Sequence, residues 1–190
     1  MELQLLDTKV IEFIFHHHIV KDFPTAETRP LKNMLQLYHS QHYRGYGLYD
    51  HDELLGYAFF AGDQTQQVLL LDYFAIVENK RSFGYGSQFL QLLKKQMQGN
   101  LIIAEVESVE STKNSEERQL RHRRIQFYLR NSFTKSSLNC RLFGVDYSLL
   151  YLFDQQVDDN ALYEYIKALY HSIFNPIIYK LFVKLKRGVK

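Results

Sequence analysis

The stretch "LLLDYFAIVENKRSFGYGSQFLQLLKK" (residues 69–95) changes character twice along its length. It begins with an apolar run typical of a buried strand and ends with apolar residues at helical spacing. Between them lies a basic turn that contains Gly84 and Gly86. Glycine lets the backbone approach a ligand, and the first N–H groups of a helix favour phosphate oxygens. The stretch therefore predicts a strand, a phosphate-binding turn and a helix; a tight turn without a ligand is the alternative.

Two common nucleotide-binding motifs do not describe this turn. A dinucleotide fingerprint requires a third glycine at residue 89, where the chain has Phe89. The Lys-Ser/Thr pair of a P-loop is also missing. The glycine turn must therefore be interpreted from its surroundings.

Length and composition predict a single globular protein. The chain has 190 residues, of which 46% are apolar and 23% charged, and this excludes a disordered class. A formal charge of +2 does not predict a polyanionic partner. Cys140 is the single cysteine, so an internal disulfide and a cysteine-built metal site are excluded. The first residues do not resemble a signal peptide and no apolar run has membrane-spanning length, so we expect a cytoplasmic protein without membrane contact.

The remaining segments alternate between helical and strand patterns. Periodicity predicts helices over 7–22 and 29–40, strands over 46–50, 54–62, 67–77 and 101–107, and a helix from Asn114 to about 131. A hairpin around Gly144 and two terminal helices broken at "NPI" (175–177) follow. The tail "KLFVKLKRGVK" is interpreted as a solvated helix end. This order predicts an α/β (mixed α+β) fold with helices covering a sheet.

Two motifs resemble the GNAT superfamily of acetyl-CoA-dependent N-acetyltransferases. Residues 81–86 (Arg81-Ser82-Phe83-Gly84-Tyr85-Gly86) match its pyrophosphate loop, Arg/Gln, two residues, Gly, any residue, Gly/Ala. The segment "RRIQFYLRNSF" (123–133) is similar to its helix that ends before a strand. Ser132 replaces the usual glycine there, so Asn131 is expected to adopt the left-handed conformation that stops the helix.

The resemblance implies a central mixed, mostly antiparallel sheet of about six to seven strands flanked by helices. The GNAT domain would span 1–156, with a C-terminal helical extension over 157–190 packed on the same domain. The implied cosubstrate is acetyl-CoA, with no metal. Its pantetheine arm would lie along Phe74, Ala75 and Ile76. Its pyrophosphate would be held by the turn and the first helical residues, which are Arg81, Ser82, Phe83, Gly84, Tyr85, Gly86 and Ser87.

Four residues are candidates for catalysis. By resemblance, Tyr128 is the general acid that protonates the coenzyme A thiolate, and a core aromatic is the alternative. Strand alternation places Glu105 and Glu107 on one face, where two carboxylates can draw in a cationic amine and accept its proton. Ion pairs with the arginines of the next helix are the alternative for both glutamates. Glu27 lies where the family often builds the acceptor site.

The expected function is that of a cytoplasmic, bacterial N-acetyltransferase, an acyltransferase that passes acetyl directly to a primary amine of a small, cationic acceptor. The alternative is a non-catalytic acyl-CoA-binding sensor or interaction module of the same fold. The cluster "ERQLRHRR" (117–124) contains acids and lacks an aromatic ladder, so no nucleic-acid partner is expected. The run His16–His18 is interpreted as a solvated helix face, because neighbouring helical side chains diverge. A homodimer is possible through the extension.

Overall fold

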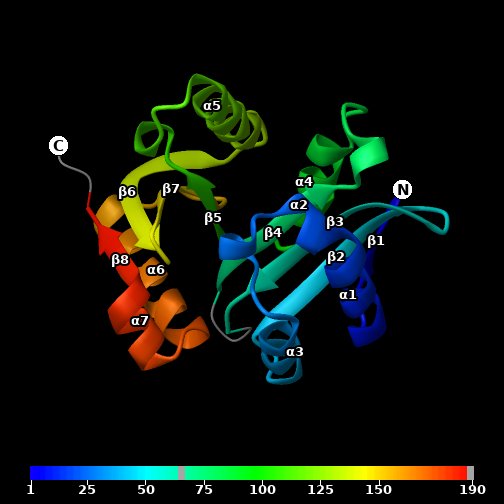
Figure 1. Ribbon diagram of the computed structural model, residues 1–190, viewed down its shortest axis with the longest axis horizontal. Coiled ribbons are helices and arrows are strands. Elements are labelled where there is room, and N and C mark those ends of the chain that lie inside the picture. Colours follow the sequence, from blue (N-terminus) through cyan, green and yellow to red (C-terminus); the bar gives the residue numbers. More distant parts are fainter. Residues whose placement is uncertain (64–66, 188–190) are drawn as a thin grey trace. The chain divides into compact units, whose positions relative to one another are not determined.

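The computed structural model of the protein describes residues 1–63 and 67–187. Its eight strands are hydrogen-bonded in the order β1-β2-β3-β4-β5-β7-β6-β8, and helices flank them (Figure 1). The pairs β1–β2, β2–β3, β5–β7, β6–β7 and β6–β8 are antiparallel. The predicted mixed α/β fold with a mostly antiparallel sheet is therefore confirmed.

The chain forms two compact units. The first comprises Met1–Gln64 with Leu71–Gln98, and the second comprises Thr65–Leu70 with Gly99–Lys190. Strand β4 (Val68–Ile76) contributes to both units, because its residues up to Leu70 belong to the second. The predicted C-terminal extension lies in the second unit, and residues 188–190 of it are outside the described part of the chain.

The first unit contains three further strands and the helices that pack on them (Figure 1). The predicted helix over 7–22 is one helical segment that begins where the Asp7 carboxylate accepts the Val10 N–H at 2.9 Å and ends at Phe23. A π-helical turn widens its middle. The elements are β1 (Glu2–Leu5), α1 (Thr8–Ile14), η1 (Phe15–Ile19), α2 (Val20–Asp22), η2 (Thr25–Glu27), α3 (Leu31–His39), β2 (Tyr43–Asp50), β3 (Glu53–Ala61), η3 (Glu78–Lys80) and α4 (Tyr85–Gln96).

The second unit contains the remaining strands and the long helix α5. Positive φ angles of 48° at Phe143 and 88° at Gly144 form the predicted hairpin turn between β6 and β7. Asn114 caps α5 as predicted, because its side chain accepts the N–H groups of Glu116 and Glu117. The elements are β5 (Leu101–Glu107), η4 (Val109–Ser111), α5 (Ser115–Arg130), β6 (Thr134–Leu142), β7 (Val145–Leu152), α6 (Asp159–Ile173), α7 (Pro176–Phe182) and β8 (Val183–Lys186).

Two short strands were not predicted, so the sheet has eight strands rather than six to seven. Strand β1 pairs with β2, with Leu3 opposite Leu48, but its side chains are mostly exposed and leave no periodic pattern. Strand β8 pairs with β6, with Leu185 opposite Cys140. The interpretation of the tail as a helix end was therefore wrong beyond Phe182. A partner strand some forty residues away supplies the hydrogen bonds that decide this conformation.

The end of α5 also differs from the prediction. Asn131 has φ −101°, whereas Ser132 has φ +70° and takes the left-handed position itself. The Asn131 side chain stops the helix in another way, because its Nδ2 donates to the Phe127 carbonyl at 2.8 Å. A serine therefore occupies the conformation for which glycine is the usual residue.

Candidate active site

The loop over residues 81–87 follows η3, which comes after β4, and its last three residues form the first turn of α4. Gly84 is the N-cap residue of α4 with φ +82°, and Ser82 has φ +71°. Left-handed residues in such a turn direct successive N–H groups into a concavity that suits an anion. A Cβ atom added to Gly84 would meet no heavy atom within 4 Å, so the space beside the loop is open. The loop therefore fits a phosphate group at the N-terminus of a helix of 12 residues.

The side chain of Arg81 anchors this loop. Its Nε donates to the Ile76 carbonyl at 3.0 Å, and its Nη2 lies 2.5 Å from Oδ1 of Asp22. Asp22 also accepts the hydroxyl of Tyr57 at 2.8 Å. The Arg81 guanidinium group thus connects the loop to β4 and to helix α2, which contains Asp22. The Arg81 N–H donates to the Glu78 carbonyl at 3.3 Å, so its backbone amide also has a partner within the protein.

The other predicted cofactor residues continue from β4 through the loop. Phe74, Ala75 and Ile76 are half-buried on β4, and the ring of Phe74 lies 5.3 Å from that of Phe89 on α4. The N–H groups of Ser87 and Gln88 donate to the Gly84 carbonyl, so helical hydrogen bonding begins there. All ten predicted cofactor residues lie in the first unit.

Glu27 lies in η2, a segment that is held by a buried network. The Tyr73 hydroxyl donates to the Glu27 carbonyl at 3.1 Å and accepts the Arg29 N–H at 2.7 Å. The Arg29 guanidinium binds both oxygens of Asp72 at 3.1 and 3.2 Å, and the Tyr43 hydroxyl donates to Asp72 at 2.6 Å. A buried bidentate pair of this kind fixes geometry strongly. The backbone of Glu27 therefore has a defined position in the first unit.

Glu107 forms the ion pairs that were the alternative interpretation of both strand glutamates. Its Oε1 lies 3.0 Å from Nη2 of Arg121, and its Oε2 lies 2.5 Å from Nη1 of Arg124. Arg121 also donates to the Ser108 carbonyl at 2.9 Å. Both oxygens of the Glu107 carboxylate are thus occupied by guanidinium groups of α5. The alternative interpretation is confirmed for Glu107.

Glu105 has a different partner, which the sequence reasoning did not find. The hydroxyl of Tyr170, on α6, donates to Oε1 of Glu105 at 2.5 Å. The same hydroxyl lies 3.4 Å from Sγ of Cys140. A signal was available, because Leu162, Ile166 and Leu169 place Tyr170 on the buried face of α6. A buried tyrosine hydroxyl usually has a polar partner, although the sequence does not say which one.

Tyr128 lies on α5, four residues before Ser132. Its ring packs against those of Phe127 and Phe133, at centroid distances of 5.4 and 5.0 Å. Burial raises the pKa of Tyr128 to about 12, although the charge of Arg124 acts in the opposite sense. The phenol therefore carries its proton at neutral pH, as a general acid must.

Comparisons with known proteins place this geometry in a structural class. No protein-family model matches the sequence, and no curated protein matches it significantly. Solved structures do match. A protein assigned to the GNAT acetyltransferase family, from Bacteroides thetaiotaomicron, superposes with a TM-score of 0.70 at 20% identity over 92% of this chain and 100% of its own.

The protein has the GNAT fold. Spermidine N-acetyltransferase from Vibrio cholerae, solved with CoA and spermine, matches with a TM-score of 0.60 at 12% identity over 80% of this chain and 94% of its own. The ribosomal-protein-S18-alanine N-acetyltransferase from Escherichia coli matches with a TM-score of 0.56 at 15% identity over 84% of this chain and 97% of its own. The predicted fold family is thereby confirmed.

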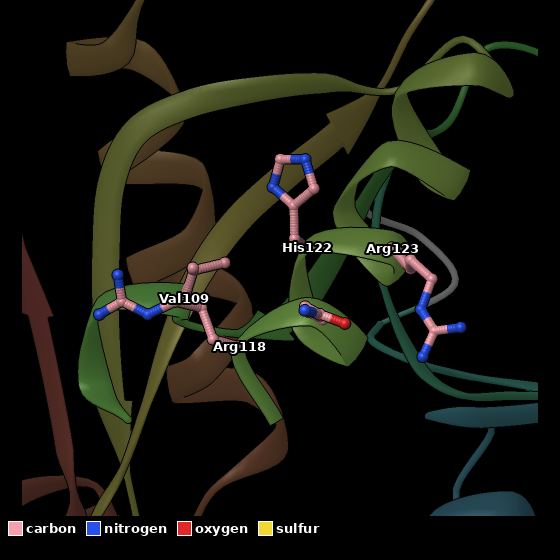
Figure 2. A pocket seen from close by; sticks show the side chains of 5 residues that line it. Val109, Arg118, His122 and Arg123 are labelled. Atoms are coloured by element: carbon pink, nitrogen blue, oxygen red, sulfur yellow. The ribbon is translucent and has the colours of Figure 1, made fainter. Parts of the chain in front are cut away.

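Within this GNAT fold, the basic side chains of α5 lie in two different environments. Arg121 and Arg124 bind Glu107, whereas a shallow hollow beside η4 is lined by Val109, Arg118, Gln119, His122 and Arg123. Figure 2 shows that the side chains of Arg118, His122 and Arg123 point in different directions. They do not converge on a common point, so the hollow is not a single anion site.

The histidine run His16–His18 lies in the π-helical turn. His16 and His17 are exposed, and His18 is half-buried near the ring of Tyr57. Burial lowers the pKa of His18, against the opposing charge of Asp22. Among residues 1–63 and 67–187, no three His, Cys, Asp or Glu side chains are grouped to hold a metal ion. In the same residues no helix is long and apolar enough to cross a membrane.

Proposed function

We propose that the protein is an acetyl-CoA-dependent N-acetyltransferase, bacterial and cytoplasmic, that passes acetyl to a primary amine of a small, cationic acceptor. The observation that carries the proposal is the loop over residues 81–87. It combines two left-handed residues, open space at Gly84 and the N-terminus of α4. The GNAT fold adds support, because residues 81–86 resemble the pyrophosphate motif of that superfamily in sequence.

Donor binding uses backbone groups. The N–H groups of residues 82–86 would hold the pyrophosphate, and the Ser87 hydroxyl would add a donor. Backbone groups of β4 at Phe74, Ala75 and Ile76 would hold the pantetheine arm and polarise the thioester carbonyl. Acetyl-CoA supplies the activated acyl group when it is bound. The Arg81–Asp22 pair keeps the loop in a conformation that is prepared for it.

Two side chains would move the protons. Glu105 accepts the proton that the amine nitrogen loses as the new C–N bond forms, through a water molecule. Tyr128 donates its phenolic proton to the sulfur that leaves as the C–S bond breaks. The two transfers leave an amide, a neutral thiol, a protonated Glu105 and a deprotonated Tyr128, and proton exchange with solvent then restores both side chains. Glu107, whose oxygens are both bound by arginines, would fix α5 against β5, and Glu27 would line the acceptor side.

Transfer would be direct, without an acyl-enzyme. Cys140 is the single thiol of the chain. It is buried on β6, and burial raises the pKa of its thiol well above the ordinary value. A protonated, buried thiol is a poor nucleophile. This observation favours attack by the acceptor amine itself.

The acceptor class rests on charge and on the structural neighbours. One neighbour is named for spermidine and contains spermine, and another is named for an alanine of a ribosomal protein. Both names describe amine acetylation, but of a small cation in one case and of a protein in the other. The carboxylate candidates of each unit, Glu27 in the first and Glu105 in the second, favour the small cation, because a carboxylate attracts a protonated amine.

The test is the release of free coenzyme A from acetyl-CoA in the presence of a panel of amines. The panel comprises polyamines, aminoglycosides, amino-acid derivatives and a peptide with a free N-terminus. We expect release above background with polycationic amines, together with acetyl-CoA binding in calorimetry. Binding without release from any amine would favour the non-catalytic acyl-CoA sensor. Absence of binding would reject both functions.

A further inference from the structure

Helix α7, in the second unit, carries an exposed apolar surface. Successive helical residues are rotated by about 100°, so residues 177, 178, 181 and 182 form one arc of about 140° along the helix. The other side of α7 carries Tyr179, whose ring stacks on that of His171 of α6 at a centroid distance of 3.8 Å (Figure 1). The helix thus packs on its unit through one side. The side chains of the opposite side, which we call the apolar arc, are exposed; they are Ile177, Ile178, Leu181 and Phe182.

The hairpin turn between β6 and β7 extends the apolar arc. The ring of Phe143 is 48% exposed and stacks on the ring of Phe182 at a centroid distance of 5.3 Å. The Phe143 N–H donates to the Phe182 carbonyl at 3.1 Å, so a backbone hydrogen bond holds the two rings together. Two distant segments of the chain therefore form one apolar surface. Contiguous exposed apolar groups of this kind often mark a binding surface for another molecule.

The charge beside the apolar arc is positive. Lys180 lies on α7 between Ile177 and Leu181, and Lys184 and Lys186 lie on β8, the strand that follows directly. All three lysines are exposed, and no ion pair within residues 1–63 and 67–187 involves any of them. The sequence after residue 164 contains no Asp or Glu. The positive charge of these lysines is therefore available to an anionic partner.

Other charged groups of neighbouring elements have partners of their own. Asp146 of β7 pairs with Arg141 at 3.2 Å, and Glu164 of α6 pairs with Lys167 at 3.9 Å. The guanidinium group of Arg187 lies 4.7 Å from the centre of the Tyr163 ring. These contacts leave Lys180, Lys184 and Lys186 as the cations that distinguish this surface.

The kind of charged residue favours a lipid partner over a protein. Lysine is depleted in protein–protein interfaces, where arginine and aromatic residues are enriched. A symmetric contact of two copies through β8 would bring Lys184 and Lys186 close to the same lysines of the other copy, and like charges on paired strands are destabilising. An anionic bilayer offers headgroups to the ammonium groups and an apolar boundary to the side chains of the arc.

We propose that the apolar arc, with Lys180, Lys184 and Lys186, docks the protein on the surface of a bilayer that contains anionic phospholipid. The apolar side chains enter the boundary between headgroups and acyl chains, and the lysines are attracted by the negative surface. We expected no membrane contact because no apolar run has spanning length, but a surface contact needs no such run. The inference goes beyond the proposed acetyltransferase function and does not depend on it.

Co-sedimentation of the full chain with vesicles tests the proposal. Vesicles of phosphatidylcholine alone are compared with vesicles in which part of this lipid is replaced by phosphatidylglycerol. We expect binding to the anionic vesicles to be tighter by about tenfold or more, since each lysine near an anionic surface contributes about fivefold. Added salt should weaken this binding, because it screens the charges. Equal binding to both kinds of vesicle, or binding to neither kind, overturns the proposal.

The apolar contribution is measured with Leu181→Ser. Its affinity for the anionic vesicles should fall by about tenfold or more, because a leucine side chain no longer enters the bilayer. Leu5→Ser is the matched control, since Leu5 of β1 is 63% exposed and Leu181 is 61% exposed. Both variants should unfold at the wild-type temperature, because neither loses a buried side chain. An equal loss of affinity in the two variants, or no loss in Leu181→Ser, overturns the proposal.

The charge contribution is measured with Lys180→Gln, whose affinity for the anionic vesicles should fall by about fivefold. Lys95→Gln is its control, because Lys95 is also an exposed helical lysine, and within the described residues no ion pair involves it. The control should bind as the wild type does. Wild-type affinity in Lys180→Gln, or the same loss in both variants, contradicts the proposal.

A second copy of the chain is the competing occupant of the apolar arc. Light scattering of a protein that binds no vesicle would identify it, if Leu181→Ser converted a dimer into a monomer, and the proposal would then be rejected. The vesicle assay contains neither acetyl-CoA nor an amine. Failure to bind vesicles therefore leaves the proposed acetyltransferase function standing, and an inactive protein that binds anionic vesicles supports the membrane contact alone.

Discussion

The loop over residues 81–87 and the glutamate pair of β5 are built in different ways. The loop depends on neighbours in sequence: Ser82 and Gly84 adopt left-handed conformations, and α4 begins immediately. The glutamates depend on distant partners. Arg121 and Arg124 bind Glu107, and Tyr170, 65 residues away in the chain, binds Glu105. A motif with fixed spacing can therefore reveal the proposed donor site, whereas the surroundings of the proposed acceptor residues depend on tertiary contacts.

The largest expected effect separates the two glutamates. Glu105→Gln removes the proposed proton acceptor, and kcat should fall by about 100-fold or more. Glu107→Gln removes charge from two hydrogen bonds, so we expect mainly a loss of unfolding free energy, about 1–3 kcal/mol. Steady-state kinetics measure kcat for both variants, and urea unfolding measures their unfolding free energy. If Glu107→Gln lowered kcat more than Glu105→Gln, the roles would be reversed.

The next effect tests the local construction of the loop. Gly84→Val should weaken acetyl-CoA binding by about 100-fold, because the side chain displaces the phosphates and opposes the left-handed backbone. Gly99→Val is the matched control, since Gly99 has φ +84° and equally open surroundings. Both variants should lose similar stability, but only Gly84→Val should lose affinity in calorimetry. Equal affinities would show that the loop does not hold the cofactor.

A smaller effect is expected for the second proton carrier. Tyr128→Phe keeps the packing of the ring against Phe127 and Phe133 but removes the phenolic proton. Turnover should fall by about tenfold, while the affinity for acetyl-CoA is retained. Stopped-flow kinetics with the best acceptor and calorimetry measure the two quantities. Unchanged turnover would make Tyr128 a core aromatic only.

The smallest effect concerns the end of α5. Ser132→Gly should stabilise the protein by about 0.5 kcal/mol, because it relieves the left-handed serine at some cost in chain entropy. Asn131→Gly should destabilise it by about 1 kcal/mol, through loss of the bond to the Phe127 carbonyl. Urea unfolding distinguishes the two variants. If Asn131→Gly stabilised the protein instead, the prediction that residue 131 takes the left-handed conformation would be restored.

Most elements were predictable because their signals are local. Apolar periodicity and caps identified strands such as β5 (Leu101–Glu107) and the start of α5 at Asn114. Strands β1 and β8 were missed because each is four residues long and depends on pairing with a distant strand. The left-handed position at Ser132 was assigned to its neighbour, because propensity favours asparagine over serine there.

The sequence by itself determined the fold class, the order of most elements and the glycine turn at the start of α4. These features follow from backbone preferences and from side-chain patterns within a few residues of each other. Only the tertiary structure decided that Arg81 anchors the loop through Asp22, that Glu107 is bound by arginines and that Tyr170 contacts Glu105. The physical reason is that a side chain's partner depends on which segments pack together, and local spacing does not encode that.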